Sequence, residues 1–237
     1  MKPLYFTKLT FVCLLATVFT LSVKAQETKN VNIKYFSEIA VSAGIELHIL
    51  QGATESARIV ANADVIDEVV VEKNGNKINV GWKENWGFGK KHNNRTAKVY
   101  ITYKNLNEIS ASSGSFLKTE NAIKTNHLDI NASSGANIEA KVACPELELE
   151  TSSGATVKLT GVANNETLEA SSGGTVNALS VAAENAKATA SSGGNIELSV
   201  SKALETTTSS GGNIGYKGNP SLKDNSAPRR SDVRKID

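Results

Sequence analysis

The sequence predicts an all-β protein: a single-stranded parallel β-helix, a solenoid that we expect to be right-handed, with a partly antiparallel N-terminal extension. The first observation is that the tripeptide Ser-Ser-Gly recurs six times at intervals of 18 to 21 residues. The second is that apolar and polar residues alternate on both sides of these copies, as in strands with one buried face. A unit of about 19 residues cannot bury its own apolar face, whereas stacked units bury a continuous stripe. The 3.6-residue spacing of a helical repeat is absent.

Residues 1–25 have the layout of a secretory signal peptide. Lys2 and Lys8 form a basic start, an apolar run of about 15 residues follows, and small residues flank Lys24 before the expected cleavage site after Ala25. The apolar run is shorter than the ~20 residues that span a bilayer. We therefore expect an exported chain that does not span the membrane after cleavage. An N-terminal membrane anchor is the alternative.

The charge balance argues against a nucleic-acid-binding protein, and the cysteine count excludes a disulfide-stabilised one. The full chain has 26 basic and 24 acidic residues, and the signal peptide contains three of the lysines and no acidic residue. The remaining balance is close to neutral, which does not favour nucleic-acid binding. Only Cys144 remains after cleavage, so no intrachain disulfide is possible and stability must come from packing and hydrogen bonds.

Residues 26–110 are expected to form longer, partly antiparallel strands that cap or extend the solenoid. Residues 45–52 and 56–62 alternate in polarity, and a hairpin is predicted around Asn74-Gly75. Residues 83–96 form an excursion rich in charge, glycine and aromatic side chains, after which residues 97–103 re-enter the sheet. Such a cap is needed because open strand edges at a solenoid end invite aggregation.

Residues 111–219 are expected to form the regular coils, with one corner at each Ser-Ser-Gly. Ser42-Ala43-Gly44 is a degenerate upstream copy. Glycine suits a tight corner, and the small serine beside it can bond to the next serine in the stack or to free backbone groups. Near residues 166–170, the apolar residues before the corner are shifted by one position relative to the other copies. The corner glycines, to which we assign a structural role, are Gly114, Gly135, Gly154, Gly173, Gly193 and Gly211.

Residues 220–237 are polar and basic. They include four cationic residues, Arg229, Arg230, Arg234 and Lys235. We expect a weakly ordered end that covers the last coil.

Two surfaces are candidates for ligand binding. One is a column of polar residues four positions after the first serine of each corner: Asn137, Thr156, Thr175, Asn195 and Asn213. It is either a hydrogen-bonded ladder that stabilises the solenoid or a regular face for sugars or ice. The other is the loop with Trp82, Trp86, Phe88, Lys90 and Lys91. Exposed Trp and Lys suit sugar rings or a protein hot spot, and the alternative is a cap whose aromatic side chains cover the end of the core.

No catalytic or metal site is predicted, and no cofactor is expected. The three histidines, His48, His92 and His127, are scattered along the chain. An acidic column of Glu108, Asp129, Glu148 and Glu205 could bind a cation, but Lys187 interrupts it and a solvated face is the alternative. The tight carboxylate clusters of β-helix lyases and hydrolases cannot be assembled from the sequence, and one catalytic serine would not need six copies of its tripeptide.

The order of these segments resembles a known family. The degenerate copy at residues 44–50, the segment NADVIDEVVVEKNGNKINV, the Ser-Ser-Gly coils and the closing GNIGYKGNP together resemble the head-GIN-domain autotransporter adhesins, a family of unknown function common in secreted proteins of Bacteroidetes. The resemblance implies a β-helical fold and an exported location. It supplies no catalytic or ligand residues.

We therefore expect an exported, non-enzymatic binding module, either an adhesin or an envelope-structure protein, in the periplasm or on the cell surface. Its partner would be a glycan or a surface protein, and a homo-oligomer is compatible with this interpretation. A β-helix carbohydrate-active enzyme, lyase or hydrolase, is one alternative. A periplasmic scaffold or sensor is the other.

Overall fold

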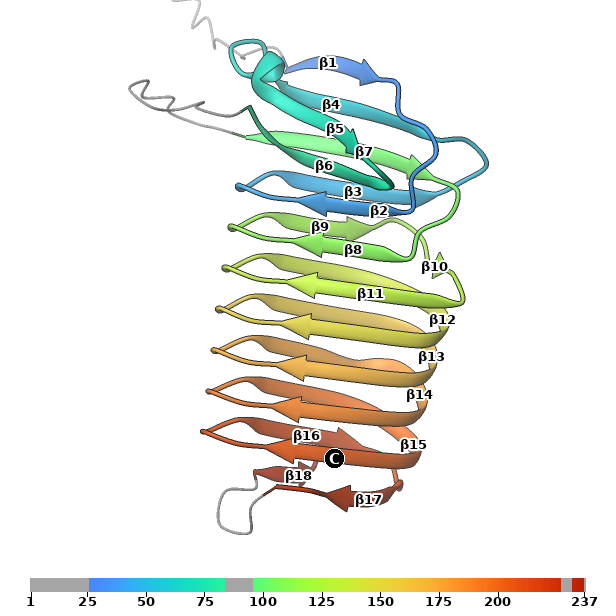
Figure 1. Ribbon diagram of the computed structural model, residues 1–237, viewed down its shortest axis with the longest axis vertical. Helices are drawn as coiled ribbons and strands as arrows, with labels where there is room; N and C mark the ends of the chain where they lie inside the picture. The colour runs from blue at the N-terminus through green and yellow to red at the C-terminus, as the bar shows by residue number, and fades with distance from the viewer. Residues whose placement is uncertain (1–25, 84–95, 227–231, 237) are drawn as a thin grey trace, which may run out of the picture.

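The computed structural model describes residues 26–83, 96–226 and 232–236. Within these residues the protein is a flattened solenoid whose strands stack side by side along its long axis (Figure 1). Each coil consists of a strand on one broad wall, a tight corner and a strand on the opposite wall. This confirms the prediction of an all-β parallel β-helix. The expected signal peptide lies outside the described residues.

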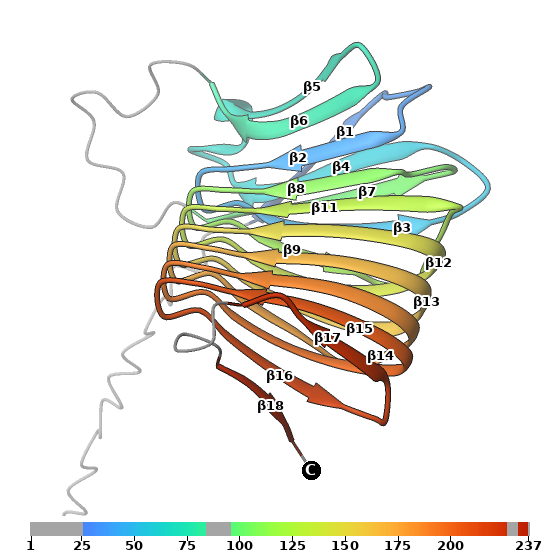
Figure 2. The same cartoon turned by 60° about the horizontal axis from the view of Figure 1, so that its bottom comes forward.

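Eighteen strands and one 3₁₀ turn make up the described part of the chain. In chain order they are β1 (Gln26–Val31), β2 (Glu38–Val41), β3 (Glu46–Gln51), β4 (Ser56–Asn62), η1 (Ile66–Glu68), β5 (Val69–Asn74), β6 (Lys77–Trp82), β7 (Ala97–Tyr103), β8 (Glu108–Ala111), β9 (Phe116–Thr119), β10 (Ile123–Lys124), β11 (His127–Ala132), β12 (Asn137–Thr151), β13 (Thr156–Ala170), β14 (Thr175–Ala190), β15 (Asn195–Thr208), β16 (Asn213–Lys217), β17 (Ser221–Asp224) and β18 (Val233–Lys235). Figure 2 shows the long strands β12 to β15 bending from one wall to the other.

We call the two walls front and back. The front wall runs β5-β6-β2-β8-β11, then through the C-terminal halves of β12 to β15, and ends at β17. The back wall runs β1-β4-β7-β3-β9, then through the N-terminal halves of β12 to β15, to β16 and β18. Among the described strands, only the pairs β1–β4, β4–β7 and β5–β6 are antiparallel, which confirms the partly antiparallel N-terminal extension.

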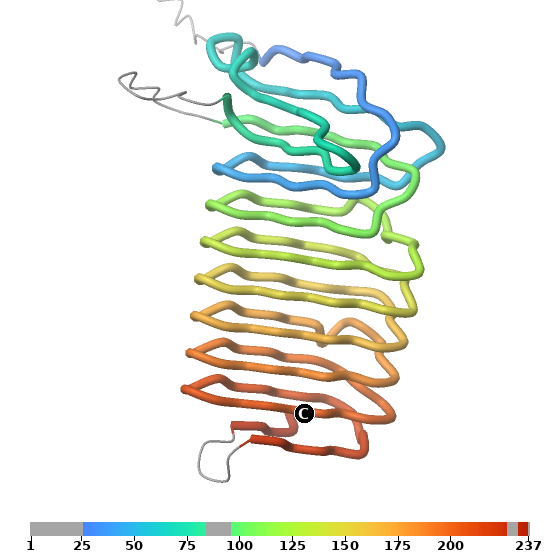
Figure 3. The backbone as a smooth tube through the Cα atoms, viewed as in Figure 1, coloured from blue at the N-terminus to red at the C-terminus, as the bar shows by residue number. Residues whose placement is uncertain are grey.

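The first coils are not stacked in chain order. The coil of β2 and β3 lies between β6 and β7 on one side and β8 and β9 on the other. The chain therefore builds one coil, leaves it to form β4 and β5 at the end of the solenoid, and returns to add coils on both sides (Figure 3). The degenerate copy Ser42-Ala43-Gly44 thus forms the corner of a true coil next to the one that carries Ser112.

The core is the thin layer between the walls. Alternate residues of most strands point inward, and large side chains such as Ile39, Leu47, Ile109 and Leu117 are fully buried. One sequence prediction is wrong here. The inward set near residues 166–170 is not out of step, because Glu166 pairs in register with Leu147 and Ala186 and points inward with them.

The Ser-Ser-Gly corners are tight turns with two residues in the left-handed region. At the first copy, φ is 53° for Ser113 and 70° for Gly114, and the Ser115 N–H donates to the Ser112 carbonyl at 3.2 Å. Positive φ at both central residues is the requirement of a type I′ turn. The sequence prediction assigned this role to glycine alone, whereas the second serine of each copy shares it: Ser113, Ser134, Ser153, Ser172, Ser192 and Ser210.

The corners also pair with one another along the stack. The Gly114 N–H donates to the carbonyl of Ser134 in the next coil at 3.0 Å, and the Gly135 N–H donates to Ser153 at 3.0 Å. The repeated corner therefore adds its own column of backbone hydrogen bonds to those of the walls.

The strained second serine leads to a stability prediction. At Ser192, φ is 48°, a region in which asparagine is several-fold enriched and β-branched residues are outliers. We expect Ser192→Asn to raise the free energy of unfolding by about 0.5 kcal/mol and Ser192→Val to lower it by about 1–2 kcal/mol. Urea unfolding of both variants measures the difference. Equal stabilities of the two variants would contradict the left-handed assignment.

The C-terminal residues differ from the expected weakly ordered end. β17 pairs with β15 on the front wall, and β18 pairs with β16 on the back wall. The described part of this end therefore extends both walls. No helix among the described residues is long and apolar enough to cross a membrane.

Candidate functional site

The outer face of the front wall contains a groove of about 630 Å³ that extends from β6 to β14. Two adjacent outward rows of mostly small side chains form it, because short side chains leave a hollow between longer neighbours. The serine row contains the first serine of each corner, and the second row lies two residues earlier on each strand. Its lining includes Ser42, Ser112, Ser133, Ser152, Ser171 and Ser191 of the serine row, and Ala40, Ser110, Asn131, Glu150, Glu169 and Thr189 of the second row.

The polar groups of the groove are not used by the fold. Within the described residues, no hydroxyl of the serine row that lines the groove makes a hydrogen bond, so the expected bonds between stacked serines do not form. Their backbone N–H groups do take part in the stack, as when Ser152 donates to the Ala132 carbonyl at 3.0 Å. The side chains of Asn131, Glu150 and Glu169 likewise have no partner in the described part of the chain. The groove is thus a row of free hydroxyl, amide and carboxylate groups on a rigid wall.

An acidic hollow of about 210 Å³ adjoins the groove and shares Asn131 and Glu150 with it. Its other acidic residues are Glu108, Asp129 and Glu148, which are register partners on β8, β11 and β12. Three members of the predicted acidic column therefore form a continuous stack on the front wall, whereas Thr167 and Lys187 separate Glu205 from them. Parallel neighbouring strands are about 4.8 Å apart, so these carboxylates repel one another.

Of the three stacked carboxylates Glu108, Asp129 and Glu148, only Glu108 has a lysine partner in the described residues. The Lys77 ammonium lies 3.3 Å from the Glu38 carboxylate and donates to Glu108 at 2.8 Å. The hydrogen bond to Glu108, followed by that to Glu38, raises the pKa of Lys77 above its ordinary value. No lysine or arginine forms an ion pair with Asp129 or Glu148 in the described residues.

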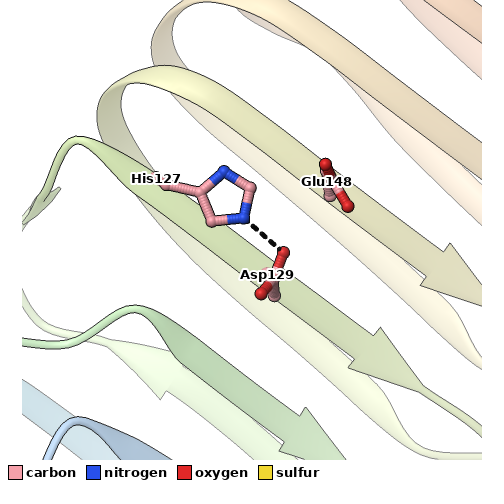
Figure 4. Close-up of side chains that lie close together, drawn as sticks. All are labelled: His127, Asp129 and Glu148. Carbon is pink, nitrogen blue, oxygen red and sulfur yellow. Dashed lines mark hydrogen bonds and ion pairs between the residues drawn. The ribbon is translucent and has the colours of Figure 1, made fainter.

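His127 lies against the unneutralised part of the column. Its Nε2 is 2.8 Å from Oδ1 of Asp129, and one donor atom each of His127, Asp129 and Glu148 lies within 4.8 Å of the others. Figure 4 shows the imidazole and the Asp129 carboxylate on one strand, facing Glu148 on the next. From the sequence alone, His127 and the acidic column are separate features. The sequence feature that indicates the cluster is a His-x-Asp pair, because residues two apart on a strand point to one face. Glu148 follows one coil later.

The predicted Asn/Thr column is also assembled, on the outer face of the back wall. Its members are register partners from Asn137 through Asn213 on β12 to β16. In the described residues they form no side-chain ladder. Asn213 donates to the Gly211 carbonyl at 3.1 Å, and Asn137 is 3.5 Å from the Gly135 carbonyl. The column is therefore a flat polar face whose side chains point to solvent.

Of the predicted aromatic loop, only Trp82 is described. It ends β6, packs against the core and donates from Nε1 to the Ala43 carbonyl at 2.9 Å. These contacts tie the start of the loop to the neighbouring corner. Trp86, Phe88, Lys90 and Lys91 lie outside the described residues.

A second hollow, of about 590 Å³, lies on the back wall beside β3, β4 and β7. There the Arg58 guanidinium lies 4.5 Å from the centre of the Tyr100 ring, and His48 stacks on the same ring at 5.0 Å. The two nitrogens of His48 contact Glu120 at 2.6 Å and Glu46 at 2.7 Å. Burial acts to raise the pKa of Glu46, but the bonds to Lys98 and His48 together hold it below its ordinary value. The carboxylates of Glu46 and Glu120 are thus already paired within this cluster.

A family model and several solved structures are similar to this chain over most of its length. A family model described as "Putative auto-transporter adhesin, head GIN domain" matches residues 35–220. A putative adhesin from Bacteroides fragilis is similar in structure, with a TM-score of 0.79, 22% identity, and coverage of 90% of this chain and 98% of that one. A putative adhesin from Parabacteroides distasonis has a TM-score of 0.73, 17% identity, and coverage of 90% and 98%.

A further similar structure is a protein from Parabacteroides distasonis described as a putative lipid binding protein. Its TM-score is 0.63 and its identity 17%, with coverage of 90% of this chain and 97% of that one. At these identities the similar structures support the fold alone. No curated protein matches the chain.

Proposed function

The chain belongs to the family of auto-transporter adhesin head GIN domains, and from this premise we propose that it is an exported, non-enzymatic adhesive module that binds glycan through the front groove. The periplasm or the cell surface is its proposed location. The Asn/Thr column and the loop with Trp82 and Trp86 are the alternative sites.

The observation that carries this proposal is the row of unused polar groups in the groove. Serine hydroxyls donate and accept, asparagine does both, and carboxylates accept. A glycan presents hydroxyl groups that pair with all three. The groups repeat along the groove at the spacing of the strands, about 4.8 Å, so an extended chain of sugars can meet several of them in succession. The strands hold them in place before binding, which lowers the entropy lost on association.

Two double variants distinguish the front groove from the back column. Ser133→Leu with Ser152→Leu fills the groove, whereas Thr156→Leu with Thr175→Leu covers the column with apolar side chains. We expect the groove variant to weaken binding to the best ligand of a glycan array at least tenfold, because leucine blocks the hollow and removes hydroxyl partners. The column variant is expected to bind normally. Surface plasmon resonance measures both affinities.

Thermal unfolding provides the control. Because all four side chains point outward, the melting temperatures of both variants should stay close to that of the parent chain. Loss of binding in the column variant alone would transfer the site to the back wall. A groove variant that binds glycan normally, or an array without any ligand, would contradict the glycan proposal and favour a periplasmic scaffold or sensor.

A carbohydrate-active enzyme is the second candidate, and the closeness of Asp129 and Glu148 favours it. Glycosidases use two carboxyl groups at comparable separations. However, Glu148 is exposed and Asp129 is only partly covered, whereas a general acid at neutral pH needs an apolar pocket that raises its pKa. Release of reducing sugar from bound glycan, abolished by Asp129→Asn, would support the enzyme.

A further inference from the structure

We propose that His127, Asp129 and Glu148 form a binding site for a divalent first-row transition-metal ion of the zinc class on the front wall. The site would exist whether or not the groove beside it binds a glycan. It combines one imidazole nitrogen with two carboxylates, a donor set that differs from a purely acidic surface.

The backbone brings the three donors together without any loop. His127 and Asp129 are two residues apart on β11, so both side chains point outward. Asp129 is in register with Glu148 on β12, which places the second carboxylate one strand away. Because both strands are held by neighbours on each side, the positions of the three Cα atoms are fixed by the fold.

The distances match an ion after small adjustments of the side chains. One donor atom from each residue lies within 4.8 Å of the other two, and His127 Nε2 and Asp129 Oδ1 are already 2.8 Å apart. Donors bound to one tetrahedral ion at ~2.1 Å are about 3.4 Å apart. Rotation of the exposed Glu148 side chain can bring its carboxylate closer, and the His127 and Asp129 donor atoms would move slightly apart. The ion would take the place of the hydrogen atom in the His127–Asp129 hydrogen bond, and the displaced proton would pass to solvent.

The charge of the surroundings also favours a cation. Glu108, Asp129 and Glu148 are stacked on successive strands, and Glu150 lies in the same hollow. Like charges on directly neighbouring strands are destabilising. Lys77 pairs with Glu108, but Asp129 and Glu148 have no lysine or arginine partner in the described residues. A divalent ion between them would replace this repulsion with attraction.

The imidazole decides the class of ion. Calcium and magnesium prefer all-oxygen sites, whereas imidazole ligands favour zinc, copper, iron and nickel. Three protein ligands leave a fourth position open, as at zinc sites that retain a water or a substrate. That position would lie at the surface beside the groove, where a donor from a bound partner could fill it.

The other described histidine shows why neighbouring carboxylates are not sufficient. His48 contacts Glu120 through Nδ1 and Glu46 through Nε2. The two carboxylates therefore lie on opposite sides of the ring and cannot share one ion with a single nitrogen. His48 is thus a matched control for His127.

Isothermal titration calorimetry of the intact chain with zinc chloride, in a non-chelating buffer and without glycan, tests the site. We expect one ion per chain and a rise in melting temperature on zinc addition, because an ion that binds only the folded chain stabilises it. His127→Gln, Asp129→Asn and Glu148→Gln should each weaken zinc binding at least tenfold. His48→Gln, and Glu205→Gln further along the same row, should leave it unchanged.

Three results would overturn the proposal: no binding at millimolar zinc, zinc binding that survives all three substitutions, and tighter binding of calcium than of zinc. Circular dichroism of each variant establishes that lost binding is not lost folding. Because the titration contains no glycan, its failure would leave the proposed function of the groove standing.

Discussion

Gly194→Ala is expected to lower the free energy of unfolding by about 3 kcal/mol or more, whereas Gly193→Ala at the adjacent position should cost about 1–2 kcal/mol. Both glycines belong to one corner, and the sequence alone does not rank them. The difference comes from what a methyl group would meet at each position.

The fourth residue of the turn, Gly194 in this corner, is where the backbone comes closest to the preceding coil. A Cβ atom at Gly194 would lie 2.3 Å from the carbonyl oxygen of Ala170 and 2.5 Å from its carbon. That carbonyl cannot move freely, because it accepts a hydrogen bond from the Ser191 N–H at 2.9 Å. Relief of the clash would therefore break the ladder between two coils.

Gly193 has a different constraint. Its φ is +75°, and a Cβ atom there would meet nothing within 4 Å. Alanine would thus bear only the conformational penalty of the left-handed region, which Ser192 already bears beside it. Equilibrium urea unfolding of both variants gives the comparison. Equal losses, or a Gly194→Ala protein as stable as the parent, would contradict the close packing of the corner against Ala170.

The coil architecture was predictable because its signals are local and repeated. The Ser-Ser-Gly spacing and the alternation around it define corner and strands without any long-range information. The order of the first coils was not predictable, because β2 and β3 pair with strands that are distant in sequence on both sides. The left-handed serine was missed for another reason: residue preferences assign that region to glycine and asparagine, and here the stacked corner overrides them.

The candidate sites also differ in how far they were predictable from the sequence. The Asn/Thr column follows from the repeat, since equal offsets from each corner must stack. The groove depends on two facts that the sequence pattern does not connect, namely that the first serines point outward and that the row beside them includes the small residues Ala40, Ser110 and Thr189. The cluster at His127 needed the register between β11 and β12, which the corner spacing already implied.

The buried Glu166 is the clearest case in which the alternation rule hid a real feature. It occupies an inward row shared with Leu128, Leu147, Ala186 and Leu204. It is 2% exposed, and neither carboxylate oxygen has a hydrogen-bond partner among the described residues. An acidic residue in an apolar row looked like a shift of register, whereas the strand keeps its register and buries the carboxyl group.

This burial predicts a marked dependence of stability on pH. Loss of hydration raises the pKa of Glu166 from 4.5 to about 8. Between these values the folded chain keeps the proton and the unfolded chain has lost it, so stability falls as pH rises from about 4.5 to about 8 and then levels off. At about 1.4 kcal/mol per pKa unit, the full loss is on the order of 5 kcal/mol.

Glu166→Gln and Glu166→Leu separate the charge from the polarity of this side chain. Glutamine has nearly the same shape and cannot ionise, so the difference in unfolding free energy between it and the parent should grow from pH 5 to pH 9. Leucine also removes the buried polar atoms and matches the other leucines of the row, and it should be the most stable of the three at pH 9. Chemical unfolding at pH 5, 7 and 9 measures all three chains. Because every other titrating group is common to them, parallel curves for glutamate and glutamine would show that Glu166 is solvated or paired in solution, and the inward placement of its carboxyl group would be wrong.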